Sequence, residues 1–178
     1  MFALVMSEDR KSMQARRDEI IEALRVLPEQ IRQVLTLDQQ VLELAKTIYK
    51  QKSLLIMGRG YNFSTCLEGA LKVKELSYMH CEGIMSGELK HGPLAMVDES
   101  LPVVMVVAKD PVYTKSLNAL QQVVARAGKP IIVADENVPD SDLMNLKNVL
   151  RPFITSEPPQ ESIMDCCLTV TAYYNLRK

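Results

Sequence analysis

The chain has 178 residues, of which 47% are hydrophobic and 24% charged, and its formal net charge is −1. This length suits one domain with a full core, and the near-neutral charge argues against a nucleic-acid-binding or anionic-membrane surface. No apolar run reaches the roughly 18 residues of a membrane span, and the four cysteines lack the spacing of a zinc site. We therefore expect reduced thiols, no metal or other cofactor, and a cytoplasmic protein.

Residues 1–50 are predicted to form a helical lead-in. The first six residues are apolar but too few for a signal peptide, and they are more typical of the end of a helix that begins before this sequence. Apolar residues at helical spacing predict a helix over residues 13–27, which Pro28 breaks or restarts. A second helix is predicted over residues 38–51, with Asp38 as its N-cap.

A strand, a glycine turn and a helix follow this lead-in. Residues 53–57 form an apolar run typical of a buried strand, and residues 64–78 have the pattern of a helix. Between them, Arg59 is flanked by Gly58 and Gly60. Arg59 is a candidate for holding an anion at the end of the strand. The alternative is that the two glycines merely permit a tight turn.

The predicted helix over residues 64–78 has a charged stripe. Glu68, Lys72 and Glu75 fall within about 60° of one another, and the rest of the circumference is largely apolar. One interpretation is a pair of ordinary surface ion pairs, worth about 0.2–0.5 kcal/mol each. However, a helix that is apolar around most of its girth is usually buried, and this one follows a strand and a turn, where α/β sheets bind ligands. We therefore expect the stripe to line a cavity.

A histidine beside a turn comes next. His91 precedes Gly92 and Pro93 and lies sixteen residues after the stripe ends at Glu75. A lone histidine before Gly-Pro is more often structural than catalytic. Beside a carboxylate–lysine stripe it becomes a candidate for proton transfer near neutral pH.

The remaining pattern predicts an α/β fold. A near-continuous apolar run at residues 102–107 is typical of a parallel strand covered on both faces, and residues 131–134 form another. A helix is predicted over residues 115–127 and a less regular strand over residues 78–84. This alternation predicts a three-layer α/β/α domain over residues 51–178, with a parallel doubly wound sheet.

The C-terminal stretch has fewer signals. Residues 149–154 have the composition of a strand, although Pro152 argues against a central position in a sheet. Residues 161–175 carry apolar side chains at helical spacing.

Three ordered motifs resemble the second sugar-isomerase (SIS) domain of the glutamine–fructose-6-phosphate aminotransferase family. They are MGRGY (57–61), LEGALKVKE (67–75) and GELKHGPLA (87–95), and ALQQVVAR (119–126) resembles the eukaryotic members. The resemblance extends over residues 1–135. It implies the SIS domain fold and the isomerase half of an enzyme that forms glucosamine 6-phosphate from fructose 6-phosphate and glutamine, in hexosamine biosynthesis.

The resemblance also implies site residues. Glu75 matches the base that moves a proton between C1 and C2 of the open-chain sugar. Glu68 and Lys72 match residues that position the sugar. We therefore count Lys72 with Glu75 and His91 as candidate catalytic residues and Glu68 as a candidate substrate-binding residue, to which the anion-binding candidate Arg59 is added. His91 matches the histidine that opens the sugar ring, which the family supplies to the neighbouring subunit's site. The expected partners are a sugar phosphate and further copies of the chain, in a homodimer or higher homo-oligomer, with neither nucleic acid nor membrane.

This sequence also departs from the family pattern. The family has a glutaminase domain and a first SIS domain with a phosphate-binding loop, and residues 1–7 resemble the end of that first domain. A family lysine near the C-terminus forms a Schiff base with the ketose, but residues 151–178 have no firm match, and Lys178 lies in no matching motif. We therefore expect the 178-residue chain to be a fragment of an enzyme and to be inactive on its own. The alternatives are a non-catalytic sugar-phosphate-binding or dimerisation module and a truncated gene product.

Overall fold

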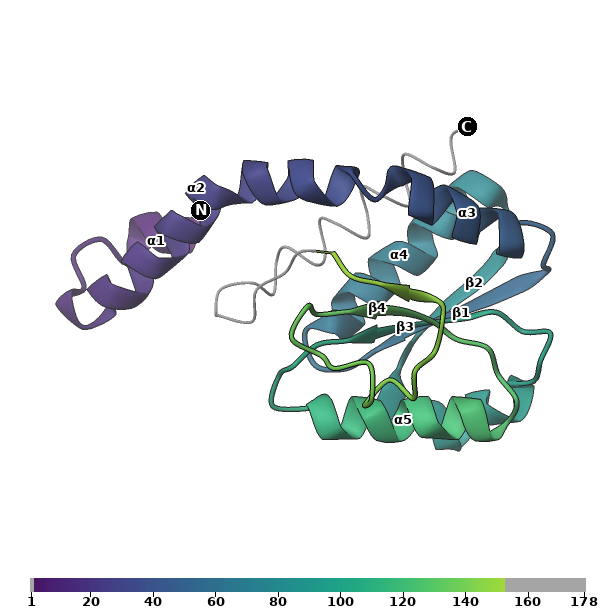
Figure 1. Ribbon diagram of the computed structural model, residues 1–178. Helices are drawn as coiled ribbons and strands as arrows, with labels where there is room; N and C mark the ends of the chain where they lie inside the picture. The colour runs from purple at the N-terminus through teal and green to yellow at the C-terminus, as the bar shows by residue number, and fades with distance from the viewer. Residues whose placement is uncertain (1, 153–178) are drawn as a thin grey trace.

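The computed structural model describes residues 2–152. Five parallel strands in this part of the chain form one sheet in the order β2-β1-β3-β4-β5 (Figure 1). The order reverses at β1, which lies between β2 and β3, and open α/β sheets bind ligands beside such a reversal. The predicted parallel doubly wound sheet is thus confirmed. The strands are β1 (Ser53–Gly58), β2 (His80–Met85), β3 (Val103–Val107), β4 (Ile131–Ala134) and β5 (Val149–Leu150).

Helices cover both faces of this sheet, as Figure 1 shows. Helix α4 (Asn62–Ser77) packs on one face, and α5 (Tyr113–Ala125) packs on the other with the 3₁₀ helix η2 (Ser86–His91). A second 3₁₀ helix, η3 (Pro93–Met96), follows η2. Because side chains alternate along a strand, each inner strand contributes to two separate cores. The α4 core includes Leu54, Ile56, Cys66, Ala70, Val73 and Cys81, and the α5 core includes Leu55, Met57, Ile84, Leu89, Leu120 and Val123.

The close packing of α4 on the sheet depends on two glycines. A Cβ atom on Gly83 would lie 2.8 Å from the backbone oxygen of Cys66, and one on Gly58 would lie 2.6 Å from the backbone oxygen of Asn62. At such distances any larger residue would push the helix away from β1 and β2. The glycines therefore fix which side of α4 meets the sheet, and hence which side faces outward.

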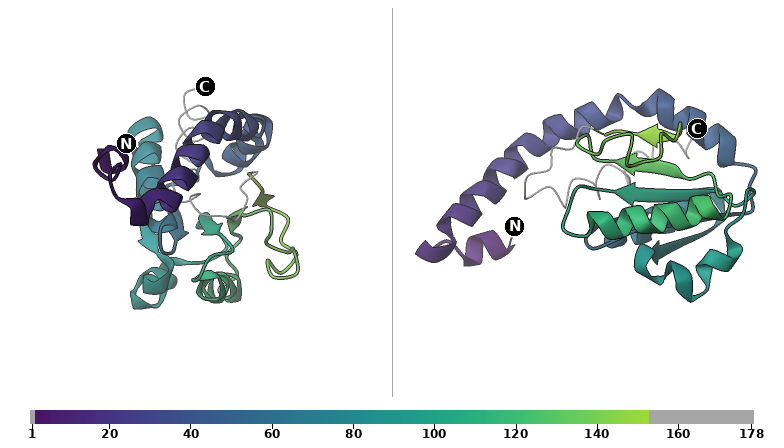
Figure 2. Two further views of the ribbon diagram at one scale, coloured as in Figure 1. Left: turned by 90° about the vertical axis from the view of Figure 1, so that its left-hand side faces the viewer. Right: turned by 60° about the horizontal axis from the view of Figure 1, so that its bottom comes forward.

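The helical lead-in comprises α1 (Phe2–Met6), η1 (Lys11–Met13), α2 (Gln14–Leu35) and α3 (Asp38–Ile48). Figures 1 and 2 show α2 projecting away from the sheet. The predicted break at Pro28 is wrong, since α2 continues through it. Proline removes one backbone hydrogen bond, but Leu27 packs against Val34 across this position and holds the two parts together. Asp38 is the first residue of α3, and the N-cap is Leu37.

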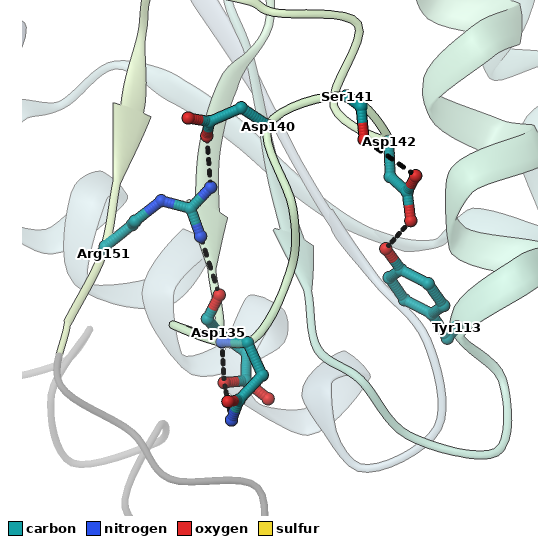
Figure 3. Close-up of polar contacts among 7 residues, drawn as sticks. Tyr113, Asp135, Asp140, Ser141, Asp142 and Arg151 are labelled. Atoms are coloured by element: carbon teal, nitrogen blue, oxygen red, sulfur yellow. Dashed lines mark hydrogen bonds and ion pairs between the residues drawn. The ribbon is translucent and has the colours of Figure 1, made fainter.

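Arg151, near the end of the described chain, is held beside β4 by hydrogen bonds and an ion pair. Arg151 Nη1 donates a hydrogen bond of 3.0 Å to the backbone oxygen of Asp135, and Nη2 donates to the carboxylate of Asp140 (Figure 3). Tyr113 Oη donates to Asp142 Oδ2 at 2.7 Å. Burial, together with this hydrogen bond, raises the pKa of Tyr113 to about 12. These contacts fasten the β4–β5 loop to the sheet and to α5.

The predicted strand over residues 149–154 is too long. β5 ends at Leu150, and Pro152, which cannot donate a ladder hydrogen bond, lies outside it. Residues 153–154 and the predicted helix over residues 161–175 lie outside the described residues. Within residues 2–152, no helix is both long enough and apolar enough to cross a membrane.

Candidate functional site

The predicted charged stripe forms a connected set on the outward face of α4. Lys72 Nζ donates a hydrogen bond to Glu75 Oε2 at 2.9 Å and lies 3.5 Å from Glu68 Oε1. The hydrogen bond to Glu75 raises the pKa of Lys72, so its ammonium stays charged at neutral pH. Lys72 is therefore a fixed cation between two carboxylates, and of the three groups only the carboxylates of Glu68 and Glu75 can accept a proton.

The prediction that this stripe lines a cavity is wrong for the described residues. The side chains of Glu68, Lys72 and Glu75 are 44%, 23% and 49% exposed. The sheet contacts only one side of α4, so Leu67 and Leu71, which the pattern predicted to be buried, are also exposed, at 47% and 42%. The stripe thus lies beside apolar side chains on an open surface, where a second surface could cover both.

The stripe also extends away from the sheet edge at which ligands were expected. Helix α4 begins with Asn62 at the carboxyl end of β1, and Glu75 lies thirteen residues further along. At 1.5 Å per residue, Glu75 is about 20 Å from the start of the helix. The carboxyl edge of the sheet instead carries Arg59.

His91 lies on the other side of the sheet from Glu75. It ends η2, whose Leu89 packs in the core on the α5 side, whereas Val73 of α4 packs on the opposite face. The His91 side chain is exposed. The described residues of one chain therefore do not bring His91 to the charged stripe.

Arg59 contacts η2 at the carboxyl ends of β1 and β2. A Cβ atom on Gly87 would lie 3.2 Å from Arg59 Nη1 and 3.3 Å from its Cζ and Nη2, so the guanidinium lies against the bare backbone of Gly87. The neighbouring Ser86, which the sequence did not single out as a ligand group, is 5% exposed, and its hydroxyl has no hydrogen-bond partner among the described residues. The register of β1 and β2 would have brought Arg59 and Ser86 together. Gly58 pairs with Met85, so the residues that follow them, Arg59 and Ser86, lie side by side at the end of the two strands.

A separate hollow lies at the opposite, amino edge of the sheet. It has a volume of about 430 Å³ and is lined by residues that include Lys52, His80, Glu82 and Asp98. None of the predicted site residues lines it. Within residues 2–152, no group of three or more His, Cys, Asp or Glu side chains is placed to hold a metal ion.

The comparisons with known proteins agree with this architecture. The model of the family described as "SIS domain" matches residues 47–176. Glutamine–fructose-6-phosphate aminotransferase [isomerizing] 2 of Mus musculus is 58% identical over 152 residues, which are 85% of this chain and 22% of the mouse protein. The Saccharomyces cerevisiae enzyme is 53% identical over 167 residues, which are 93% of this chain and 23% of the yeast protein. The chain thus spans less than a quarter of these relatives' length.

A solved structure extends the comparison to three dimensions. The C-terminal domain of glucosamine-fructose-6-phosphate aminotransferase from Francisella tularensis superimposes with a TM-score of 0.84 at 32% sequence identity. The match covers 99% of this chain and 48% of the bacterial one.

Proposed function

The chain belongs to the SIS domain family, and we propose that it is the second sugar-isomerase domain of an enzyme that forms glucosamine 6-phosphate from fructose 6-phosphate and glutamine. Residues 1–50 are its helical lead-in, residues 51–178 the domain itself, and the cytoplasm its compartment. The observation that carries the proposal is the set of Glu68, Lys72 and Glu75 on the outward face of α4. The similarity to the mouse and yeast enzymes connects this set to sugar chemistry.

Each residue of the set has a proposed role. Glu75 is the base that takes a proton from one carbon of the open-chain sugar and returns it to the next. Lys72, charged and 2.9 Å from Glu75, holds the carboxylate in place and stabilises negative charge that develops on the sugar oxygen. Glu68 positions the sugar from the other side of Lys72.

We further propose that the reacting sugar lies between α4 and a covering surface. Half-exposed leucines border the stripe, and covering Leu67 and Leu71 would contribute about 1 kcal/mol each. A covered stripe would also be shielded from water, which strengthens every charge interaction within it.

His91 is proposed to act in the site of a second subunit. Because η2 packs on the α5 side of the sheet and α4 on the other, a joint role of His91 and Glu75 is favoured between two chains rather than within one. Such an exchange requires at least a C2 homodimer, in which each site takes Glu75 from one subunit and His91 from the other.

The separation of His91 from Glu75 within one chain also favours a second candidate function, a sugar-phosphate-binding or dimerisation module without catalysis. A binding module needs charged groups to hold the sugar, but it needs no base. The two candidates therefore differ in what the Glu75 carboxylate does once the sugar is bound.

A chimeric enzyme separates them. We expect the mouse enzyme to keep forming glucosamine 6-phosphate when its matching 152-residue segment is replaced by this chain's. The 178-residue chain on its own should form none, either from glutamine or from ammonia, because it covers 22% of that enzyme. Amino sugar is measured after incubation with fructose 6-phosphate.

Two results would contradict the proposal that this chain is the catalytic domain of a larger enzyme. A chimera that folds, assembles and binds fructose 6-phosphate but forms no product would favour the non-catalytic module. Sustained synthesis by the 178 residues alone would show that the rest of the mouse enzyme is dispensable, contrary to the proposed division of labour.

A further inference from the structure

We propose that Arg59, Ser86 and the backbone at Gly87 form a phosphoryl-binding site at the carboxyl ends of β1 and β2, separate from the sugar-reacting face of α4. The strand order reverses between β1 and β3, and the site adjoins this reversal on the β2 side of β1. Open α/β sheets bind their ligands in the crevice at such a point.

The seating of Arg59 is the first support. Its guanidinium lies against Gly87, where a Cβ atom would come within 3.2 Å of Nη1, so even a methyl group at position 87 would shift it by a few tenths of an ångström. Arg59 forms no ion pair or hydrogen bond with any described residue, Glu88 included. A partly buried arginine with five unused donors in a planar fork is suited to the oxygens of a phosphoryl group.

Ser86 is the second, independent support. Its residue is 5% exposed, yet its hydroxyl oxygen has no hydrogen-bond partner among the described residues. Buried polar groups are nearly always hydrogen-bonded, so a buried hydroxyl without a partner in the protein indicates that a bound ligand supplies one. Because Gly58 pairs with Met85, the residues after them, Arg59 and Ser86, lie at the same sheet edge. An oxyanion bound by Arg59 at this edge would lie beside Ser86, whose enclosed hydroxyl would have to turn toward it to become its partner.

The backbone beside Arg59 adds a further favourable feature. Gly60 has φ +59°, which turns the chain sharply into α4, and the first turn of α4 contains no acidic residue. The amino end of a helix carries a partial positive charge that attracts anions. This end of α4 therefore adds to the attraction that Arg59 exerts.

This site is not the one that holds the reacting carbons. Glu75 lies about 20 Å along α4 from the end that adjoins Arg59, which is longer than a six-carbon sugar with its phosphate. The inference rests on the anion-binding role proposed for Arg59, but it does not depend on Glu75 acting as a base. A ligand bound here is therefore a second phosphorylated molecule.

Inorganic phosphate is the probe for this site. In the isotope-labelled 178-residue chain at constant ionic strength, we expect phosphate to shift the backbone amide resonances of residues 59–61 and 86–88 in a saturable way. Arg59→Gln should weaken this binding about ten- to hundredfold, because it removes a charge-assisted hydrogen-bond donor. Gly87→Ala should weaken it by less than Arg59→Gln, because the new Cβ only shifts the guanidinium by a few tenths of an ångström.

Two matched controls and a second ligand complete the test. Arg126→Gln removes an exposed arginine at the end of α5, and Glu75→Gln alters the proposed base, so both should bind phosphate as the unaltered chain does. Fructose 6-phosphate should shift the same amides and fructose should not. The proposal is overturned if the shifts do not saturate, if Arg59→Gln leaves them unchanged, or if fructose produces them equally. Loss of activity when Glu75→Gln is placed in the chimeric enzyme, with phosphate binding by the 178-residue chain intact, separates this site from the proposed reaction.

Discussion

Glu75→Gln in the chimeric enzyme should slow proton transfer between C1 and C2 of the sugar by about 10²- to 10⁴-fold, the usual contribution of a general base. The amide keeps the size of the carboxylate and can still accept a hydrogen bond from Lys72, which lies 2.9 Å from the carboxylate. The affinity for fructose 6-phosphate should therefore change little. Incorporation of solvent deuterium into the sugar measures the proton transfer directly.

The chain supplies a control ion pair with the same spacing and a similar distance, although its acid and base occur in the opposite order. Glu43 and Lys46 on α3 form an i, i+3 ion pair at 2.8 Å, against 2.9 Å for Lys72 and Glu75. If both are ordinary ion pairs on a helix surface, Glu43→Gln and Glu75→Gln should have equally small effects on the rate of deuterium exchange. We expect Glu43→Gln to exchange deuterium at the unaltered rate. Unchanged exchange in Glu75→Gln would remove Glu75 from the role of base.

The second large effect concerns the sharing of residues between subunits. Chimeras carrying either His91→Ala or Glu75→Gln in every subunit should have little activity. A heterodimer with one subunit of each kind should recover activity at one of its two sites, because that site takes an intact Glu75 from one subunit and an intact His91 from the other. The sheet that separates these residues within one chain is the physical reason.

Purified heterodimers are needed for this comparison, with two differently tagged subunits. Activity no greater than the sum of the two altered homodimers would mean that His91 acts in its own subunit or only supports the Gly-Pro turn. Heterodimers in which a single subunit carries both substitutions provide the control. They should retain little activity, because each site then lacks one of the two groups.

The sheet and its helices could largely be predicted from the sequence. Continuous apolar runs such as residues 103–107 occur where strands are covered on both faces, and the structure has them in the centre of the sheet. β2 has an irregular pattern because it lies at the edge, where only Cys81 and Ile84 are buried. The helical spacing of Glu68, Lys72 and Glu75 placed these residues together, as the structure shows.

Other features depend on contacts between distant parts of the chain. A periodic pattern cannot tell a leucine that packs on the sheet from one such as Leu67, which α4 leaves exposed. Likewise, the sequence places His91 sixteen residues after Glu75, and only the crossing of the chain to the other face separates them. The contact of Arg59 with Gly87 depends on strand register, which the pattern of these segments did not specify.

The most direct test of the α4 face as a reaction surface is a crystal structure of the chimeric enzyme with an open-chain analogue of fructose 6-phosphate. We expect a Glu75 carboxylate oxygen to lie about 3–3.5 Å from C1 or C2 of the analogue, with Leu67 and Leu71 covered by a neighbouring surface. His91 from the other subunit should reach the oxygen of the sugar ring. An analogue bound elsewhere, with Glu68, Lys72 and Glu75 still facing bulk solvent, would contradict it.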